Sequence, residues 1–115
     1  MASNRIQYHK TAERPALELW LIDDDGALID FSTGYTFALK VGNVGSTALL
    51  TKTSGIAGAV GAGEEPTGTP NVVVSWTAGE LNLTPGSYAA QLTATTAGLD
   101  RIFTLPPFDI LDALT

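Results

Sequence analysis

The side chains that could carry out catalysis are few and scattered along this chain of 115 residues. The single histidine, His9, stands near the N-terminus, and no cysteine is present to act as a nucleophile or a thiolate ligand. None of the serines lies in a Gly-x-Ser-x-Gly motif, so a Ser-His-Asp site would have to recruit His9 from the terminus. A catalytic site needs a nucleophile, a base within reach and a group that orients the base. The sequence therefore predicts no catalytic residues and no enzyme.

The densest group of acidic side chains is Asp23-Asp24-Asp25, which Gly26 follows directly. Consecutive residues of a turn point in different directions, and a calcium loop of the EF-hand kind needs acids at alternate positions. We interpret the run as a hairpin turn, with a weak Ca²⁺ site as the alternative. The glycines between Gly58 and Gly63 are followed by no lysine and no helix, so they form no phosphate cradle. No metal ion and no cofactor is expected.

The composition is that of a folded domain with a sparsely charged, acidic surface. Hydrophobic residues make up 44% of the chain and charged residues 16%, which is too apolar for a disordered chain. The uncharged part of the surface is either a solvated surface rich in Thr, Ala and Gly or a surface covered by neighbouring proteins. The net charge of −6 and the scattered basic residues predict no nucleic-acid partner. No apolar run approaches the ~20 residues that span a bilayer, so no membrane partner is expected.

Alternation of apolar and polar residues with a period of two dominates the sequence and predicts β-strands. The alternation is clearest over residues 16–22, 35–41 and 87–96, and turn signals rich in Gly, Asp and Pro separate such segments. No segment has twelve residues of helical periodicity. We expect an all-β domain over residues 15–115, an immunoglobulin-like β-sandwich of about seven or eight short strands. Its predicted core contains Leu19, Phe37, Leu39, Val73 and Leu92, with Trp20 and Trp76 as candidates for a buried tryptophan.

Three segments carry more specific expectations. Residues 54–70 hold five glycines and two prolines and are predicted to be the longest loop. Thr77 and Glu80 have the spacing of a capping box and predict one helical turn. Because proline cannot donate a hydrogen bond to a strand ladder, Pro106-Pro107 places the last strand, residues 108–111, at a sheet edge or in the other sheet.

Residues 1–14 are surplus to a sandwich of this size and are predicted to form an N-terminal arm. Ile6 and Tyr8 alternate with Gln7 and His9 in a strand pattern that has no partner nearby in the sequence. Such a strand can add to the exposed sheet edge of a neighbouring subunit. The segment from Ile56 to Ala62 is neutral and apolar, which favours burial against another surface. The alternative is that the arm pairs with its own sheet and that the Gly-rich loop is mobile. The candidate subunit contacts are Ile6, Tyr8, Ile56 and Val60.

The order of the motifs resembles a known family. A Pro-led strand over residues 15–22 runs into Asp-Asp-Asp-Gly and a short return segment, and much later Val74–Leu81 precedes the Pro-Gly-Ser-Tyr of residues 85–88. This arrangement is similar to the Ig-like N-terminal domain of phage baseplate upper proteins, found in tail-tip proteins of long-tailed phages. The likeness covers roughly residues 10 to 111. Two departures are the long Gly-rich segment and the absence of a receptor-binding or coiled-coil region before Thr115.

The resemblance implies a bacteriophage virion structural protein, an Ig-like module of the tail tip or baseplate. Such a module would assemble through contacts with other virion proteins of the tail or capsid, as a homo-oligomer or ring. It would be made in the host cytoplasm and end in the virion. A capsid decoration protein, or a β-sandwich module that binds carbohydrate or a host surface, is the alternative. The carbohydrate function would require exposed, coplanar aromatic side chains, which the sequence does not place in its loops.

Overall fold

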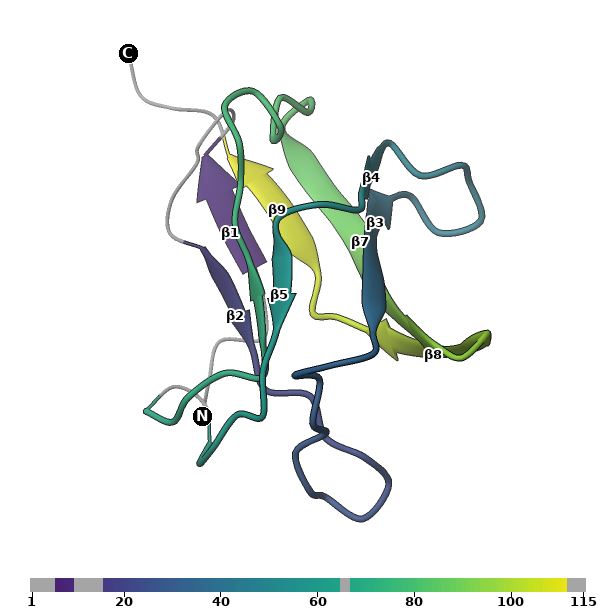
Figure 1. Cartoon of the computed structure of the whole chain (residues 1–115). Helices are drawn as coiled ribbons and strands as arrows, with labels where there is room; N and C mark the ends of the chain where they lie inside the picture. Colours follow the sequence, from purple (N-terminus) through teal and green to yellow (C-terminus); the bar gives the residue numbers. More distant parts are fainter. Residues whose placement is uncertain (1–5, 10–15, 65–66, 112–115) are drawn as a thin grey trace.

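The computed structural model describes residues 6–9, 16–64 and 67–111, and it shows a sandwich of two β-sheets (Figure 1). The described residues contain nine strands and no helix. The strands are β1 (Ile6–His9), β2 (Leu17–Leu19), β3 (Thr36–Gly42), β4 (Leu50–Lys52), β5 (Ile56–Gly58), β6 (Val72–Val74), β7 (Gly86–Thr96), β8 (Leu99–Thr104) and β9 (Phe108–Leu111). The predicted all-β sandwich is therefore confirmed.

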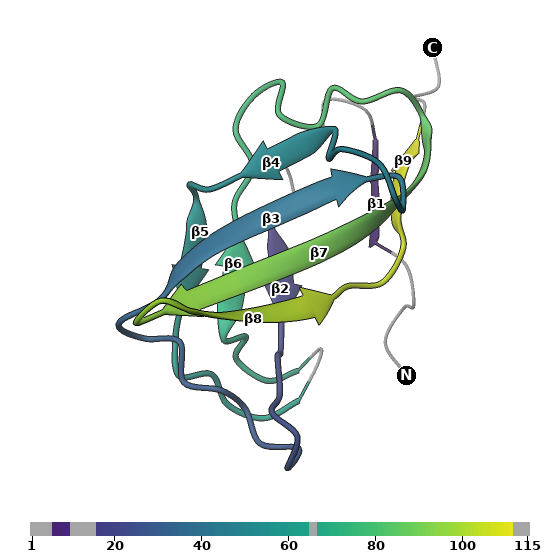
Figure 2. The same cartoon turned by 90° about the vertical axis from the view of Figure 1, so that its right-hand side faces the viewer.

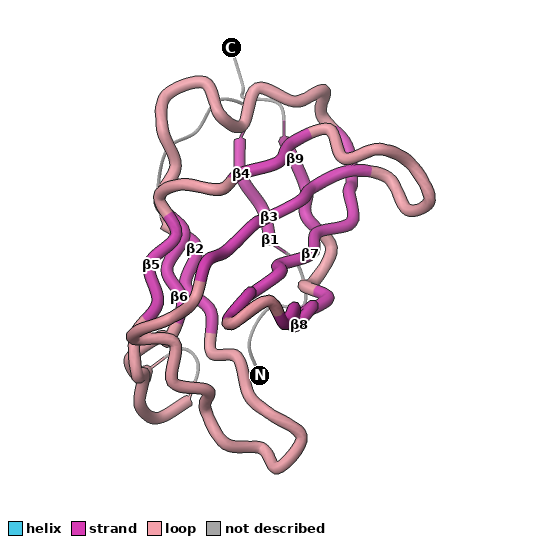
Figure 3. Tube along the Cα trace, turned by 45° about the vertical axis from the view of Figure 1, so that its right-hand side comes forward, coloured by secondary structure: helices cyan, strands magenta, loops and turns pink. Residues whose placement is uncertain are grey.

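The larger sheet has the strand order β1-β9-β7-β3-β4, with β8 also paired to β7, and the smaller sheet has the order β2-β6-β5. This division matches an immunoglobulin-like sandwich, in which strands B, E and D form one sheet and strands G, F, C and C′ the other. The hydroxyl of Tyr88, near the start of β7, donates a hydrogen bond to the carbonyl of Thr84. This contact is the tyrosine corner of immunoglobulin-like domains. Long connections project from the strand layers (Figure 3).

The core lies between the two sheets and follows the predicted alternation, with one exception. Leu19, Leu39 and Leu92 are buried as predicted, and Phe37 is half-buried and packs against them. The prediction for Val73 is wrong, because β6 turns its two flanking valines into the core and leaves Val73 partly exposed. Three consecutive valines offer no polar–apolar contrast, so only the pairing of β6 with β2 and β5 decides which face is buried.

An aromatic cluster fills one end of the core. The Trp76 ring lies 5.5 Å from the Tyr8 ring and 6.0 Å from the Phe108 ring, measured between centroids in edge-to-face geometry. Trp20 is only half-buried, so Trp76 is the tryptophan that occupies the core. Because Tyr8 belongs to β1 and Phe108 to β9, the cluster also fixes these parallel strands side by side.

The strand β7 pairs with two successive strands along one of its edges. Its second half pairs with β8 and its first half with β9, as the long light-green strand of Figure 2 shows. Pro106 and Pro107 lie between β8 and β9, where neither strand is paired, so no ladder hydrogen bond is lost. The expectation that residues 108–111 lie at an edge or in the other sheet is wrong, because β9 lies between β1 and β7.

The acidic run of residues 23–25 forms the predicted hairpin turn. The amide of Asp23 donates to the carbonyl of Ala27 at 2.9 Å, and the Asp23 carboxylate accepts from the amides of Asp25 and Ala27. Gly26 has a φ of +83°, a conformation that glycine adopts without strain. The return segment makes one bridge, between Ile22 and Leu28, rather than a strand.

The Gly-rich segment, predicted to be a loop, contains the strand β5 and a bridge between Ala62 and Thr69. A Cβ on Gly58 would lie 2.2 Å from the carbonyl oxygen of Phe31, so this glycine allows a close approach of two backbones. Asn71 is fully buried and holds the surrounding segments together. Its side chain accepts from the amide of Leu21 at 2.8 Å and donates to the carbonyls of Leu21 and Ile29 at 2.8 and 2.9 Å.

A buried ion pair joins β4 to the connection between β6 and β7. Lys52 points into the sandwich with its side chain 1% exposed, and its ammonium lies 2.7 Å from the nearer carboxylate oxygen of Glu80. The same ammonium stands 5.6 Å from the centre of the Trp76 ring. Glu80 also accepts from the amide of Thr77 at 2.8 Å. The capping-box contact therefore forms as the spacing predicts, although residues 78–81 form turns and not a helix.

The pKa of Glu80 is held below its usual value. Burial alone would raise this pKa, but the hydrogen bonds from Lys52 and Thr77 and the charge of Lys52 together outweigh that effect. A carboxylate whose pKa is lowered in the folded state stabilises the fold at pH values above its ordinary pKa of 4.5. This stabilisation is lost as the pH falls through the lowered pKa.

We therefore expect Glu80→Gln to destabilise the protein at neutral pH by about 3 kcal/mol, because it leaves a buried ammonium without its counter-charge. The loss should shrink below pH 4.5, where Glu80 of the unfolded wild-type chain begins to be protonated, and should disappear as pH falls through the lowered pKa of the folded state. Urea denaturation at several pH values measures both effects. The double variant Lys52→Met/Glu80→Gln is the control and should recover most of the stability. A single variant as stable as the wild type at pH 7 would contradict the role of the pair.

The turn between β7 and β8 contains a strained residue. Ala97 and Gly98 both have positive φ, +51° and +79°, as a two-residue type I′ hairpin requires. A Cβ is unfavourable there, and Asn tolerates the conformation better.

We expect Ala97→Asn to raise stability by about 1 kcal/mol in thermal denaturation. The matched change Ala89→Asn, inside β7, should not stabilise; equal effects at both positions would refute the strain.

Candidate functional site

The surface of the larger sheet that points away from the core is nearly uncharged. Paired residues of neighbouring strands share a face, so the register of β3, β4, β7 and β8 defines this surface. We call it the outer face; it consists of Thr36, Ala38, Lys40, Thr51, Ala89, Gln91, Thr93, Thr95, Asp100, Ile102 and Thr104. Lys40 and Asp100 are its only charged members, and most of the others carry short hydroxyl or methyl side chains.

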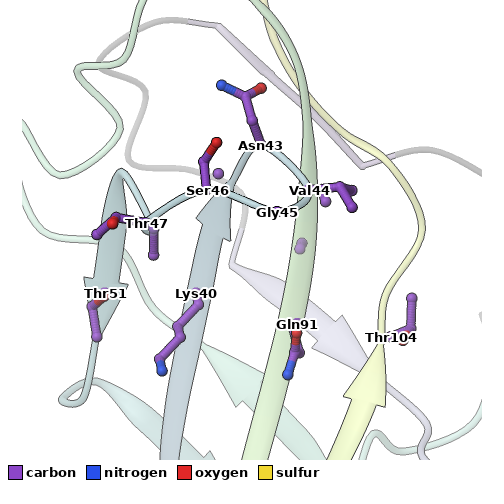
Figure 4. Close-up of a pocket in the computed structure, with 13 residues that line it drawn as sticks. Lys40, Asn43, Val44, Gly45, Ser46, Thr47, Thr51, Gln91 and Thr104 are labelled. Atoms are coloured by element: carbon purple, nitrogen blue, oxygen red, sulfur yellow. The ribbon is translucent and has the colours of Figure 1, made fainter.

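A hollow of about 610 Å³ lies at one end of the outer face, beside the connection between β3 and β4. Its floor includes Lys40, Gln91 and Thr104, and residues 42–48 of the connection form its wall (Figure 4). The connection is held by a hydrogen bond from the amide of Ser46 to the carbonyl of Asn43 at 3.0 Å. The hollow is therefore built on paired strands and a hydrogen-bonded turn.

The lining of the hollow is suited to hydrogen bonding and not to acid–base chemistry. Amide and hydroxyl groups come from Asn43, Ser46 and Gln91, and Lys40 supplies one positive charge. No carboxylate, histidine or aromatic ring belongs to the residues that line it. A sugar ring would find no aromatic side chain to stack on.

The four predicted subunit contacts lie in different parts of the sandwich. Ile6 and Tyr8 belong to β1, which pairs with β9 of the same chain, so the alternative in which the arm joins its own sheet holds for residues 6–9. Tyr8 is buried in the core, and burial raises the pKa of its phenol, an effect that the nearby Trp76 indole partly offsets. Ile56, in β5, is half-buried against the core. Val60 is 58% exposed, and its contact with another subunit stays a prediction.

The remaining residues considered for chemistry are the histidine and the acidic side chains. The backbone of His9 lies in β1 opposite Leu111. Among the described residues, no three His, Cys, Asp or Glu side chains gather where they could hold a metal ion. Nor do those residues form a helix that could cross a membrane.

Comparison with protein-family models, curated proteins and solved structures finds no match for this chain. The outer face and the hollow therefore rest on the geometry alone. The alternation over residues 35–41 predicted a strand there, but not the residues that β4 and β8 place beside its outward side chains. The register between strands brings these residues together, and no local sequence signal records it.

The burial of Tyr8 leads to a direct test of the arm. We expect Tyr8→Ala to lower the free energy of unfolding by about 3 kcal/mol, because it removes a ring packed on two others and leaves a cavity. Val60→Ala is the control and should change stability by less than about 0.5 kcal/mol. Chemical denaturation of the purified chain measures both. If Tyr8→Ala left the stability unchanged, β1 would not belong to the core.

Proposed function

We propose that this chain is a structural protein of a bacteriophage virion, an Ig-like module of the tail tip or baseplate that assembles through protein–protein contacts. The resemblance described above supplies the class of particle. Its motif residues occupy defined positions in the sandwich: the Asp-Asp-Asp-Gly hairpin, the buried Trp76 and the corner made by Tyr88. The observation that carries the proposal is the outer face.

The outer face offers a partner protein an area with few charges to desolvate. Burying an unpaired charge is costly, and the centres of protein interfaces are depleted in charged residues. The outer face has two charged residues, Lys40 and Asp100. Asp100 already accepts a hydrogen bond from the hydroxyl of Thr95 at 2.7 Å. The face is also rigid, since β7 pairs with β3 along one edge and with β8 and β9 along the other.

The alternative functions differ from the proposal in what they require of the same surface. Carbohydrate binding would need aromatic rings at the hollow, and its lining has none. A capsid decoration protein would use the same kind of uncharged contact, so only the location in the particle separates it from a tail protein. The proposal favours the tail because the resemblance is to tail-tip domains.

Purified phage particles provide the test. We expect the chain to be detected in them by mass spectrometry and located at the tail tip by labelling with antibodies in electron micrographs. A Thr93→Arg variant places a charge in the middle of the outer face and should reduce incorporation into particles at least tenfold. Ala57→Arg, on the exposed side of β5, is the matched control and should be incorporated normally. Both variants should retain the wild-type circular dichroism spectrum.

Three results would contradict the proposal in different ways. Absence of the chain from purified particles would remove the virion role. Labelling on the capsid shell would favour decoration of the capsid. Equal incorporation of both arginine variants would show that the outer face is not the assembly surface.

A further inference from the structure

The edges of the two sheets differ in how well they are protected. Within the described residues, β1, β2, β4, β5 and β8 each pair on one side only. β1 has four residues, and β2, β4 and β5 have three each, whereas β8 has six. Proteins commonly protect an edge by shortening it or by turning a charged side chain inward. β4 uses both devices, because it is short and its Lys52 points into the core. The strand β8 is longer, and its Arg101, on the core-side face by its pairing with Ala94, stays exposed and is not buried as Lys52 is.

Each face of β8 carries one strongly exposed apolar side chain, beside the charged Asp100 and Arg101. Leu99 is 72% exposed and Ile102 is 59% exposed. The register with β7 places them on opposite faces, since Leu99 pairs with Thr96 and Ile102 pairs with Thr93. A partner docked on one face would cover only one of them. A strand added at the edge would flank both and would also pair the free backbone groups.

We propose that β8 pairs in antiparallel fashion with β8 of a second copy of this chain, so that the two larger sheets join edge to edge. The inference rests on the proposed function as an assembly module and assigns one of its contacts. The six-stranded larger sheets of the two copies would become one continuous sheet, as in other cases of strand addition.

The sequence of β8 is compatible with itself in one central register. A two-fold axis perpendicular to the sheet keeps each side chain on its own face, so only residues of the same face can oppose each other. With the axis at Ile102, this side chain meets its own copy, Asp100 opposes Thr104, and Arg101 opposes the ring of Phe103. Arg101 above an aromatic ring is favourable. No like charges are opposed in this register.

Other registers are worse. An axis at Arg101 would oppose two guanidinium groups, and an axis at Asp100 would oppose two carboxylates, both of which are destabilising between paired strands. An axis at Phe103 would pair fewer residues within β8, because Arg101 and Asp100 would then oppose Leu105 and Pro106, beyond the end of the strand. The register centred on Ile102 is therefore the one that we assign.

The contact is small, so the isolated dimer should be weak. One strand pair buries less than the roughly 1,000 Å² of a stable interface. The two chains also each carry a net charge of −6, and their repulsion is screened by salt. Dimerisation should therefore strengthen with ionic strength. In a ring, repeated weak contacts of this kind reinforce one another.

Sedimentation equilibrium of the purified chain tests the inference. We expect the wild type to dimerise at concentrations up to about 1 mM. Ile102→Lys and Ile102→Glu place like charges across the axis, and each should weaken dimerisation at least tenfold. An equimolar mixture of the two variants should restore a mixed dimer, because Lys then faces Glu. Val44→Lys is the control: Val44 is an apolar residue 88% exposed in the connection between β3 and β4, and its substitution should leave dimerisation unchanged.

A wild type that stays monomeric at about 1 mM, or an equal loss in Val44→Lys, would overturn the inference. Two Ile102 variants that fail to form a mixed dimer would overturn the assigned register. Thermal denaturation of every variant confirms that the fold is retained. The result is separable from the proposed function: a chain present in phage particles but monomeric in isolation refutes the β8 contact alone, and a β8 dimer absent from particles refutes the virion role alone.

Discussion

The buried ammonium of Lys52 is the constraint on which much of this sandwich depends. A charge in the core destabilises the fold unless a counter-charge reaches it, so the connection after β6 must turn to bring Glu80 within 2.7 Å. The indole of Trp76 lies against the same ammonium and packs in turn on Tyr8 and Phe108. One ion pair thus links β4, the turn that leads to β7, and the aromatic cluster that seats β1 on β9.

The same lysine determines which edge of the larger sheet is open. At β4, its inward side chain prevents a partner strand from finding a flat, apolar edge. At the opposite side of the sheet, β8 has a longer ladder and exposed apolar side chains. Of these two edges, β4 is short with an inward lysine, and β8 is longer with exposed apolar side chains. A pairing of β8 with its own copy is closed by the two-fold axis, because the contact uses the same strand of both copies.

The sequence predicted the fold best where polar and apolar residues contrast strongly. The strands around Leu39 and Leu92 were found by their alternation, and the hairpin after Ile22 by its Asp and Gly residues. The prediction from sequence failed where the contrast between polar and apolar residues is missing, as at Val73. The glycines around Gly58 predict a loop because glycine usually signals flexibility, whereas the structure has a strand there, and the missing Cβ makes room for the backbone of Phe31.

Lys52 illustrates a second kind of limit. In the sequence Thr-Lys-Thr it resembles a solvated position, and only the register with Leu39 shows that it faces the core. Glu80 was recognised for its spacing from Thr77, and the predicted contact forms. A helix does not follow, because Gly79 has a φ of +80° and the carboxylate is turned towards Lys52.

The candidate site depends on strand order, which leaves no trace in local sequence. Thr51, Gln91 and Thr104 are distant along the chain and meet at the hollow only because β4, β3, β7 and β8 are neighbours. For the same reason the partner of β1 could not be found nearby, since it is β9 at the other end of the chain.

A two-fold axis perpendicular to the sheet at β8 would turn both outer faces to the same side. The joined sheets of the proposed dimer would then present the outer faces of both copies, with few charges, as one continuous surface.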